Sequence, residues 1–233
     1  MLDIVASTGS TNSDLLERIR ADNPPPEGYW LIADRQLAGR GRQGRAWLDA
    51  EGNFSGSTAI HLRAGDPPAP TLALLVGVAV HEALGAGSEL RLKWPNDVLL
   101  NGAKLVGILL ERHGDHVVAG IGVNLVAAPE IAGRRVGKMP VATTRNAFAE
   151  HLAGIFSTLL ARWHEGGPLD WLLADWTNRA LPRGTLLACE HATAGPVTGT
   201  FAGLSPDGAL LLRLADGAVH VIHAGDVELV GEG

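Results

Sequence analysis

The sequence predicts an α+β fold in which a mixed β-sheet packs with helices and a small β-barrel follows. Three observations predict it. Strand-like runs joined by turn signals occupy residues 90–125, and apolar residues recur at helical spacing across residues 143–163. Roughly the last fifty residues are short, closely spaced β runs. A chain of 233 residues is long enough for a large domain with a small appendage and a buried core.

The first predicted element is a short amphipathic helix. Ser10 to Asp14 supplies candidate N-cap residues, and Leu15, Leu16 and Ile19 form an apolar stripe behind them. The proline run 24–26 ends this helix. Further along, the patterns predict a strand over 29–33, a loop over 35–45, a strand over 58–62 and a buried helix over 71–84.

The middle of the chain is predicted to form four strands followed by two helices. The expected strands are 90–93, 98–100, 104–111 and 116–125. Asn101-Gly102 predicts a two-residue type I′ turn, because both positions of that turn need positive φ. A helix is expected over 143–163, followed by a shorter one over 168–176.

The composition changes near Pro182-Arg183-Gly184, which predicts a domain boundary with domains at 1–182 and 183–233. Ser205 to Gly208 and Asp216-Gly217 are explicit turn signals in the second part. The predicted β runs are 186–187, 197–204, 209–214, 219–223 and 227–230. This pattern favours an SH3-like or similar small barrel.

Composition excludes several classes of protein. Hydrophobic residues make up 46% and charged residues 19%, as in an ordinary globular enzyme. The net charge of −6 argues against a general nucleic-acid binder. Cys189 is the only cysteine, and the apolar stretch 71–83 is too short to span a bilayer. The first residues carry no basic segment typical of a signal peptide, so we expect a cytoplasmic protein without a membrane partner.

The most informative motif is Lys93-Trp94-Pro95-Asn96-Asp97, which runs into the predicted hairpin. Lys104 stands just beyond the hairpin turn, on a predicted strand where an ammonium group can be aimed at a ligand. The chain has three lysines, and two of them lie in this segment.

A second motif is Gly39-Arg40-Gly41-Arg42-Gln43-Gly44-Arg45. Glycines let the backbone approach a ligand, and guanidinium groups suit a phosphate or carboxylate. Residues 35–48 contain four arginines and no acidic residue, so the segment is basic in an acidic chain. An anionic ligand, a solvated flexible loop and an RNA-contacting patch all remain open for this motif alone.

Other candidates are ambiguous when taken singly. The alternating glycines in Gly120-Ile121-Gly122-Val123-Asn124 favour either a ligand or a helix packed against bare backbone. Ser10-Thr11-Asn12 alone is best explained as a helix cap. The pairs His113/His116 and His220/His223 have no converging acidic ligand in the sequence, so we expect no metal there.

Taken together and in this order, the motifs resemble the biotin–protein ligases, that is, the biotin–[acetyl-CoA-carboxylase] ligases. The resemblance covers nearly the whole chain. It is carried by Ser10-Thr11-Asn12, Gln36, residues 39–45 with Trp47, residues 93–97, residues 104–107 and residues 120–124. The fold it implies is the class II synthetase-like biotin–lipoate ligase fold with a C-terminal SH3-like barrel.

The resemblance implies ATP-dependent activation of biotin to biotinyl-5′-AMP, then transfer of biotin to a lysine of a carrier protein. It implies a catalytic set of Lys104, Arg42 and Asp97. The implied biotin-binding residues are Ser10, Thr11, Asn12, Gln36, Gly39, Arg40, Lys104, Gly107, Gly120 and Gly122. The implied ATP- and adenylate-binding residues are Arg40, Arg42, Arg45, Trp47, Asn96, Asp97, Lys104 and Asn124. Asp97 is also the implied ligand of Mg²⁺.

The resemblance further implies a biotin carboxyl carrier protein as partner and a possible homodimer. The catalytic motifs begin close to Met1, so we expect no DNA-binding domain and no operator binding. Residues 226–230 offer only acids and apolar groups, so we expect no catalytic role for them. The loop 39–48 is expected to be mobile when empty and ordered when filled.

Two alternatives from different classes remain. A lipoate–protein ligase or octanoyltransferase would also modify a carrier lysine, but that family lacks the Lys-Trp-Pro-Asn-Asp motif. A non-enzymatic RNA- or phosphate-binding module would use the arginine loop and the barrel, and the acidic net charge argues against it.

Overall fold

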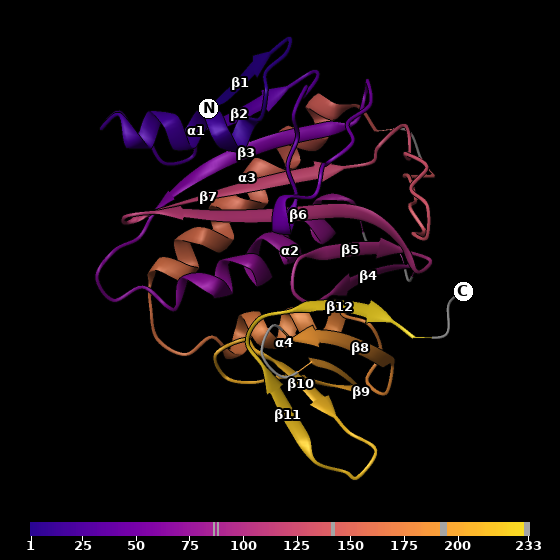
Figure 1. Cartoon of the computed structure of the whole chain (residues 1–233). Coiled ribbons are helices and arrows are strands. Elements are labelled where there is room, and N and C mark those ends of the chain that lie inside the picture. The colour runs from indigo at the N-terminus through magenta and orange to yellow at the C-terminus, as the bar shows by residue number, and fades with distance from the viewer. Residues whose placement is uncertain (86, 88, 141–142, 192–194, 231–233) are drawn as a thin grey trace.

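A seven-stranded sheet forms the body of the protein (Figure 1). The computed structural model describes residues 1–85, 87, 89–140, 143–191 and 195–230, so the end of the predicted C-terminal domain, 231–233, lies outside the described residues. In spatial order the strands are β1 (Leu2–Val5), β2 (Trp30–Ala33), β3 (Phe54–His61), β7 (His116–Val123), β6 (Ala103–His113), β5 (Asp97–Leu100) and β4 (Leu90–Lys93). Only β1 and β2 pair in parallel among these neighbours, which makes the sheet mixed as predicted.

Helix α1 (Thr11–Arg20) covers one face of this sheet. Its residues Leu15, Leu16 and Ile19 are buried against Leu31 of β2 and Val118 of β7. Because successive residues of a strand point to opposite faces, Gly120 and Gly122 lie on this same face as Val118. The α1 face of β7 therefore has bare backbone beyond the helix.

The opposite face carries the larger core. There α2 (Leu72–Ala83) and α3 (Arg145–His164) pack together behind the strands. Trp30 meets Phe156 and Phe54 meets Phe148 with ring centroids 5.3 and 5.0 Å apart. α4 (Asp170–Arg179) packs against α2 and continues this layer toward β4.

The predicted elements are largely confirmed. The helices predicted over 71–84, 143–163 and 168–176 correspond to α2, α3 and α4, and the strands predicted over 104–111 and 116–125 to β6 and β7. Strand β3 begins four residues before its predicted start at position 58. β1 was not predicted at all, and it is a short edge strand that pairs with β2.

The hairpin that presents Lys104 is confirmed in its backbone geometry. Asn101 and Gly102 have φ of 49° and 76°, as a type I′ turn requires. Lys104 is the second residue of β6, and the β5–β6 register shifts between Val98 and Leu99. The bulge changes which face the following residues point to.

The C-terminal part forms a second, five-stranded antiparallel sheet. Its spatial order is β11 (Val219–Ile222), β10 (Leu210–Arg213), β9 (Gly195–Leu204), β8 (Leu186–His191) and β12 (Asp226–Leu229). This small sheet agrees with the predicted SH3-like domain. Among the described residues β11 and β12 remain the edges, so strand pairing does not close the sheet into a barrel.

The two sheets share one continuous hydrophobic core. Trp176 of α4 packs edge-on against Phe201 of β9 with ring centroids 6.3 Å apart. Trp94 donates from Nε1 to the carbonyl of Gly208 at 3.1 Å. Figure 1 shows the second sheet beside the β4 edge of the first, with β12 nearest to it. Within the described residues, no helix combines the length and apolarity needed to cross a bilayer.

Candidate active site

A cavity of about 580 Å³ lies on the α1 face of the large sheet, with β12 of the second sheet at its rim. The structure brings into its lining every residue that the sequence singled out except Gly39. These residues are Ser10, Thr11, Asn12, Gln36, Arg40, Arg42, Arg45, Trp47, Asn96, Asp97, Lys104, Gly107, Gly120, Gly122 and Asn124. They come from α1, the loop after β2, the β4–β5 connection, β6 and β7.

Asp97 lies between two lysines at the start of β5. Lys104 Nζ donates to Asp97 Oδ1 at 2.6 Å, and Lys93 Nζ lies 3.1 Å from Asp97 Oδ2. Burial alone raises the pKa of Asp97, but the two ammonium groups outweigh it and hold the pKa below its ordinary value. One carboxylate therefore holds two cations at the wall of the cavity.

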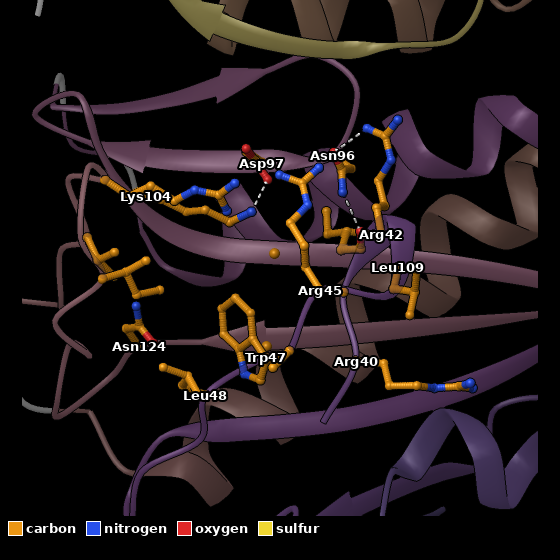
Figure 2. Close-up of a pocket in the computed structure, with 18 of the residues that line it drawn as sticks. Arg40, Arg42, Arg45, Trp47, Leu48, Asn96, Asp97, Lys104, Leu109 and Asn124 are labelled. Atoms are coloured by element: carbon orange, nitrogen blue, oxygen red, sulfur yellow. Dashed lines mark hydrogen bonds and ion pairs between the residues drawn. The ribbon is translucent and has the colours of Figure 1, made fainter. Parts of the chain in front are cut away.

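Asn96 joins the arginine loop to the sheet. Its Nδ2 donates to the carbonyl of Ile108 at 2.6 Å, and its Oδ1 accepts from Arg42 Nη1 at 3.0 Å. Figure 2 shows Arg42 and Lys104 reaching toward Asn96 and Asp97 from opposite sides, while Arg40 extends away from this group. The two ends of the Asn96 carboxamide thus fix the guanidinium of Arg42 above β6.

The C-terminal sheet reaches the same arginines. Arg42 donates from Nη2 to the carbonyl of Gly225 at 2.9 Å and lies 3.6 Å from Asp226 Oδ1. Arg45 donates to the other oxygen of Asp226, and Lys93 Nζ donates to the carbonyl of Val227 at 2.8 Å. Sequence reasoning missed these contacts and gave residues 226–230 no part in the site. No local signal shows that an acid 181 residues away would meet the loop.

The α1 end of the cavity holds a connected set of polar side chains. Gln36 Oε1 accepts from Thr11 N at 2.8 Å, and the hydroxyls of Thr11 and Ser57 are 2.7 Å apart. Ser57 Oγ donates to Asn12 Oδ1 at 2.6 Å, and Asn12 Nδ2 donates to Glu111 Oε2 at 2.9 Å.

The same polar set ends at the arginine loop, because Arg40 Nη2 lies 3.1 Å from Glu111 Oε1. Ser57 and Glu111 were not singled out from the sequence. Both face α1 because they alternate with core residues of β3 and β6, a pattern that could have found them. Ser10, the N-cap residue of α1, makes no side-chain capping hydrogen bond, although its position predicted one.

Trp47 lies over the bare backbone of two strands. A Cβ atom at Gly122 would fall 2.2 Å from Trp47 Cε2, and one at Gly107 would fall 2.8 Å from Trp47 Cζ3. Both distances are far inside van der Waals contact, so only glycine admits the indole here. A Cβ at Gly120 would instead fall 2.2 Å from Asn12 Oδ1.

Gly39 has a structural place beside the cavity. Its carbonyl accepts from Trp47 N at 2.9 Å, and a Cβ at this position would lie 2.8 Å from the Trp47 carbonyl oxygen. The loop therefore folds back on itself at Gly39 and so sets the position of Trp47.

Asn124 lines the cavity, but its side chain is engaged in holding the chain after β7. Its Nδ2 donates to the carbonyl of Gly137 at 3.0 Å, and its Oδ1 accepts from Asn53 Nδ2 at 3.4 Å. The backbone of Lys104 holds the same segment through two hydrogen bonds. Its N–H donates to the carbonyl of Arg135, and its carbonyl accepts from the N–H of Gly137. Pro129, Ile131 and residues 133–136 line the cavity too, and sequence reasoning did not include them.

The expected magnesium ligand does not fit the metal in this arrangement. Mg²⁺ takes oxygen ligands in octahedral geometry, usually one or two carboxylates with waters and substrate phosphates. Both oxygens of Asp97 face lysine ammonium groups, and Asp226 faces two arginines. The described residues hold one group of three or more candidate metal ligands, and it lies elsewhere in the fold.

This group consists of His61, Asp115 and His116. The expectation that no acid converges on His116 is therefore wrong.

Two protein-family models match the chain. The Biotin/lipoate A/B protein ligase family matches residues 4–124, and the Biotin protein ligase C terminal domain matches residues 191–230. A biotin–[acetyl-CoA-carboxylase] ligase of Paracoccus denitrificans is 34% identical over 90% of this chain and 93% of its own length. A protein of the same description from Mycobacterium tuberculosis is 36% identical over 97% of this chain and 88% of its own length.

Solved structures agree in fold. A biotin protein ligase from Aquifex aeolicus, in complex with biotin and ATP, superposes with a TM-score of 0.85 and 27% sequence identity. The superposition covers 98% of both chains. The similarity therefore extends over both sheets.

Proposed function

This chain belongs to the biotin/lipoate A/B protein ligase family, and from that premise we propose how its cavity works as a biotin–[acetyl-CoA-carboxylase] ligase. The enzyme joins biotin to ATP to give biotinyl-5′-AMP and pyrophosphate. It then transfers the biotinyl group to a lysine of the biotin carboxyl carrier protein. The observation that carries the assignment is the grouping of Lys104, Arg42 and Arg45 around one cavity.

The first step brings two anions together. A carboxylate oxygen of biotin attacks the α-phosphorus of ATP, and pyrophosphate leaves. The cavity lining carries more cations than acids. The cations are Arg40, Arg42, Arg45, Lys93, Lys104, Arg134 and Arg135, and the acids are Asp97, Asp226 and Glu228. This excess of positive charge offsets repulsion between the substrates, and it stabilises the charge that develops in the transition state.

Lys104 and Arg42 have separate roles in this proposal. Lys104 is fixed on β6 by Asp97, so its ammonium group sits at a defined point rather than on a mobile loop. It is placed to contact the biotin carboxylate and the α-phosphate together. Arg42 is held by Asn96 and presents a planar fork suited to phosphate oxygens. Asp97 orients the lysine without touching the reacting atoms.

The polar end of the cavity favours biotin over lipoate. The ureido ring of biotin offers N–H donors and a carbonyl acceptor, and buried polar groups of that kind need partners. Thr11, Asn12, Gln36 and Ser57 supply both donors and acceptors there. The dithiolane ring of lipoate has no N–H or carbonyl group, so it would leave this end of the cavity unmatched.

An RNA-binding role for the arginine loop has less support. Arg40, Arg42 and Arg45 are engaged with Glu111, Asn96 and Asp226, all of which line or border the cavity. A module that tracks a nucleic-acid backbone needs a continuous basic surface with accessible aromatic rings. The one tryptophan of this loop packs instead over Gly107 and Gly122.

The remaining predicted contacts complete the adenylate site in this proposal. Trp47 covers the adenylate as an apolar lid, with the loop closing further when both substrates are bound. Asn124 acts through the segment after β7, which its side chain holds against Gly137. Because Asp97 does not fit a magnesium ion here, we assign no step to a protein-held metal, and any Mg²⁺ enters with the triphosphate.

In the second step the carrier lysine attacks the acyl carbon, and AMP leaves. Asp97 is the carboxylate bound to Lys104, but its lowered pKa makes it a weak proton acceptor. We therefore propose that the lysine arrives already neutral, and that the closed loop keeps water from the mixed anhydride. A homodimer is a further part of this proposal, and light scattering on the purified chain tests it.

The function is tested by incubating the purified chain with biotin, ATP and an apo carrier domain. We expect pyrophosphate release that depends on biotin, followed by covalent labelling of one carrier lysine. Pyrophosphate release with lipoate in place of biotin, or none with either acid, contradicts the assignment.

A further inference from the structure

Two histidines and an aspartate meet at the end of the large sheet that is remote from the charged part of the cavity. His61 is the last residue of β3, His116 is the first residue of β7, and Asp115 precedes it in the β6–β7 turn. His61 and His116 are direct partners in the β3–β7 register, and their ring centroids lie 4.8 Å apart. Four residues, about 13 Å of strand, separate His116 from Gly120 at the cavity.

The donor atoms of this cluster have spacings close to those of a metal site. His61 Nδ1 and His116 Nε2 are 3.3 Å apart, and His61 Nδ1 lies 3.8 Å from Asp115 Oδ2. Two ligand atoms of a tetrahedral zinc ion, each about 2.0–2.1 Å from the metal, are roughly 3.3 Å apart. When one candidate ligand atom is taken from each of the three residues, all three atoms lie within 4.8 Å of one another.

Asp115 also lies against the other ring. Its Oδ1 is 2.7 Å from Nδ1 of His116, while Nε2 of that ring faces His61. The carboxylate therefore borders both imidazoles.

We propose that His61, His116 and Asp115 form a binding site for a divalent transition-metal ion, with Zn²⁺ as the representative occupant. Two imidazole nitrogens and one carboxylate oxygen suit Zn²⁺, Ni²⁺ or Cu²⁺ and do not suit Mg²⁺. The side chains of His61 and Asp115 are 50% and 64% exposed, so an ion can enter and water can complete its coordination. The ion would fasten the end of β3 to the β6–β7 turn.

The test uses the untagged full chain, because a histidine tag would bind the same ions. Isothermal titration with ZnCl₂ at pH 7.5 is expected to show one site per chain. His61→Gln and His116→Gln are each expected to weaken that site at least tenfold. His113→Gln is the matched control, because His113 pairs with His116 across the β6–β7 hairpin but lies outside the cluster. We expect it to change the affinity less than twofold.

Two further readouts separate a metal site from a hydrogen-bonded group of side chains. Co²⁺ is expected to give visible absorption bands that disappear in both ligand variants. Zn²⁺ is expected to raise the Tm of the wild type and of His113→Gln, but not of the two ligand variants. Equal Tm values without metal check that the variants fold. Absence of saturable Zn²⁺ binding, or binding unchanged in both ligand variants, overturns the proposal.

Discussion

Arg45 donates a hydrogen bond to the carboxylate of Asp226, a residue 181 positions later in the chain. The contact joins the loop after β2 to the first residue of β12, across the mouth of the cavity. Arg42 reinforces it with a second ion pair to the same carboxylate. The C-terminal sheet therefore holds the arginine loop in place, and substrate phosphates must compete with Asp226 for these two guanidinium groups.

Replacing Asp226 should loosen the loop. The arginines at positions 40, 42 and 45 are trypsin sites, so limited digestion reports how often the loop opens. We expect Asp226→Asn to be cut there severalfold faster than the wild type, and biotin with ATP to remove most of the difference. Asp216→Asn, an exposed turn acid in the same sheet, is the control. Equal cleavage rates for wild type and Asp226→Asn contradict the role assigned to this contact.

The glycines beneath Trp47 should not tolerate a methyl group. Gly122→Ala places a Cβ 2.2 Å from the indole, so we expect Trp47 to be displaced and substrate affinity to fall at least tenfold. Titration calorimetry with biotin and with ATP measures this directly.

The matched control for that variant is Gly154→Ala, at a helical position of α3 where a Cβ would meet nothing within 4 Å. It should leave binding unchanged and stabilise the protein by about 0.5–1 kcal/mol. Wild-type affinity in Gly122→Ala would show that the indole is not held against β7 when substrate binds.

The polar end of the cavity should discriminate in favour of biotin. Thr11→Val keeps the shape of the side chain and removes the hydroxyl that contacts Gln36 and Ser57. Unsatisfied buried polar groups cost about 1–3 kcal/mol, so the KM for biotin should rise between roughly fivefold and 150-fold. The KM for ATP should stay within twofold. A parallel loss for both substrates argues against a ureido site at this end.

Asp97 should affect stability across the whole neutral range of pH. Its pKa is lowered in the folded state, so it stabilises the fold above its unfolded pKa of about 3.9, and this stabilisation is lost as the pH falls through the folded value. The difference in Tm between wild type and Asp97→Asn should therefore be constant from pH 8 to pH 5 and shrink below pH 4. A difference that changes between pH 5 and pH 8 would show that Asp97 titrates there.

Local chemistry explains which elements could be predicted from the sequence. The Asn101-Gly102 turn has a backbone requirement that few residues meet, and the apolar positions of α3 repeat at the helical period. Most of the cavity residues lie in motifs that are polar, glycine-rich or both. These signals do not depend on distant parts of the chain.

The parts that were missed depend on long-range pairing. β1 is four residues long without clear alternation, and it forms only because β2 offers a parallel partner. Asp226 meets the arginine loop because the C-terminal sheet docks beside β4, and His61 meets His116 because of the β3–β7 register. Neither docking nor register can be inferred from the residues next to these side chains.

The central claim is that a strand-borne lysine and a loop arginine neutralise the two anions that form the adenylate. Pyrophosphate exchange into ATP, dependent on biotin and measured without any carrier, tests it most directly in Lys104→Gln, with Lys138→Gln as the control outside the cavity. We predict a fall of about 10²–10³-fold for Lys104→Gln, as for loss of a single transition-state donor, and a near wild-type rate for Lys138→Gln. A wild-type exchange rate in a folded Lys104→Gln variant would contradict the account.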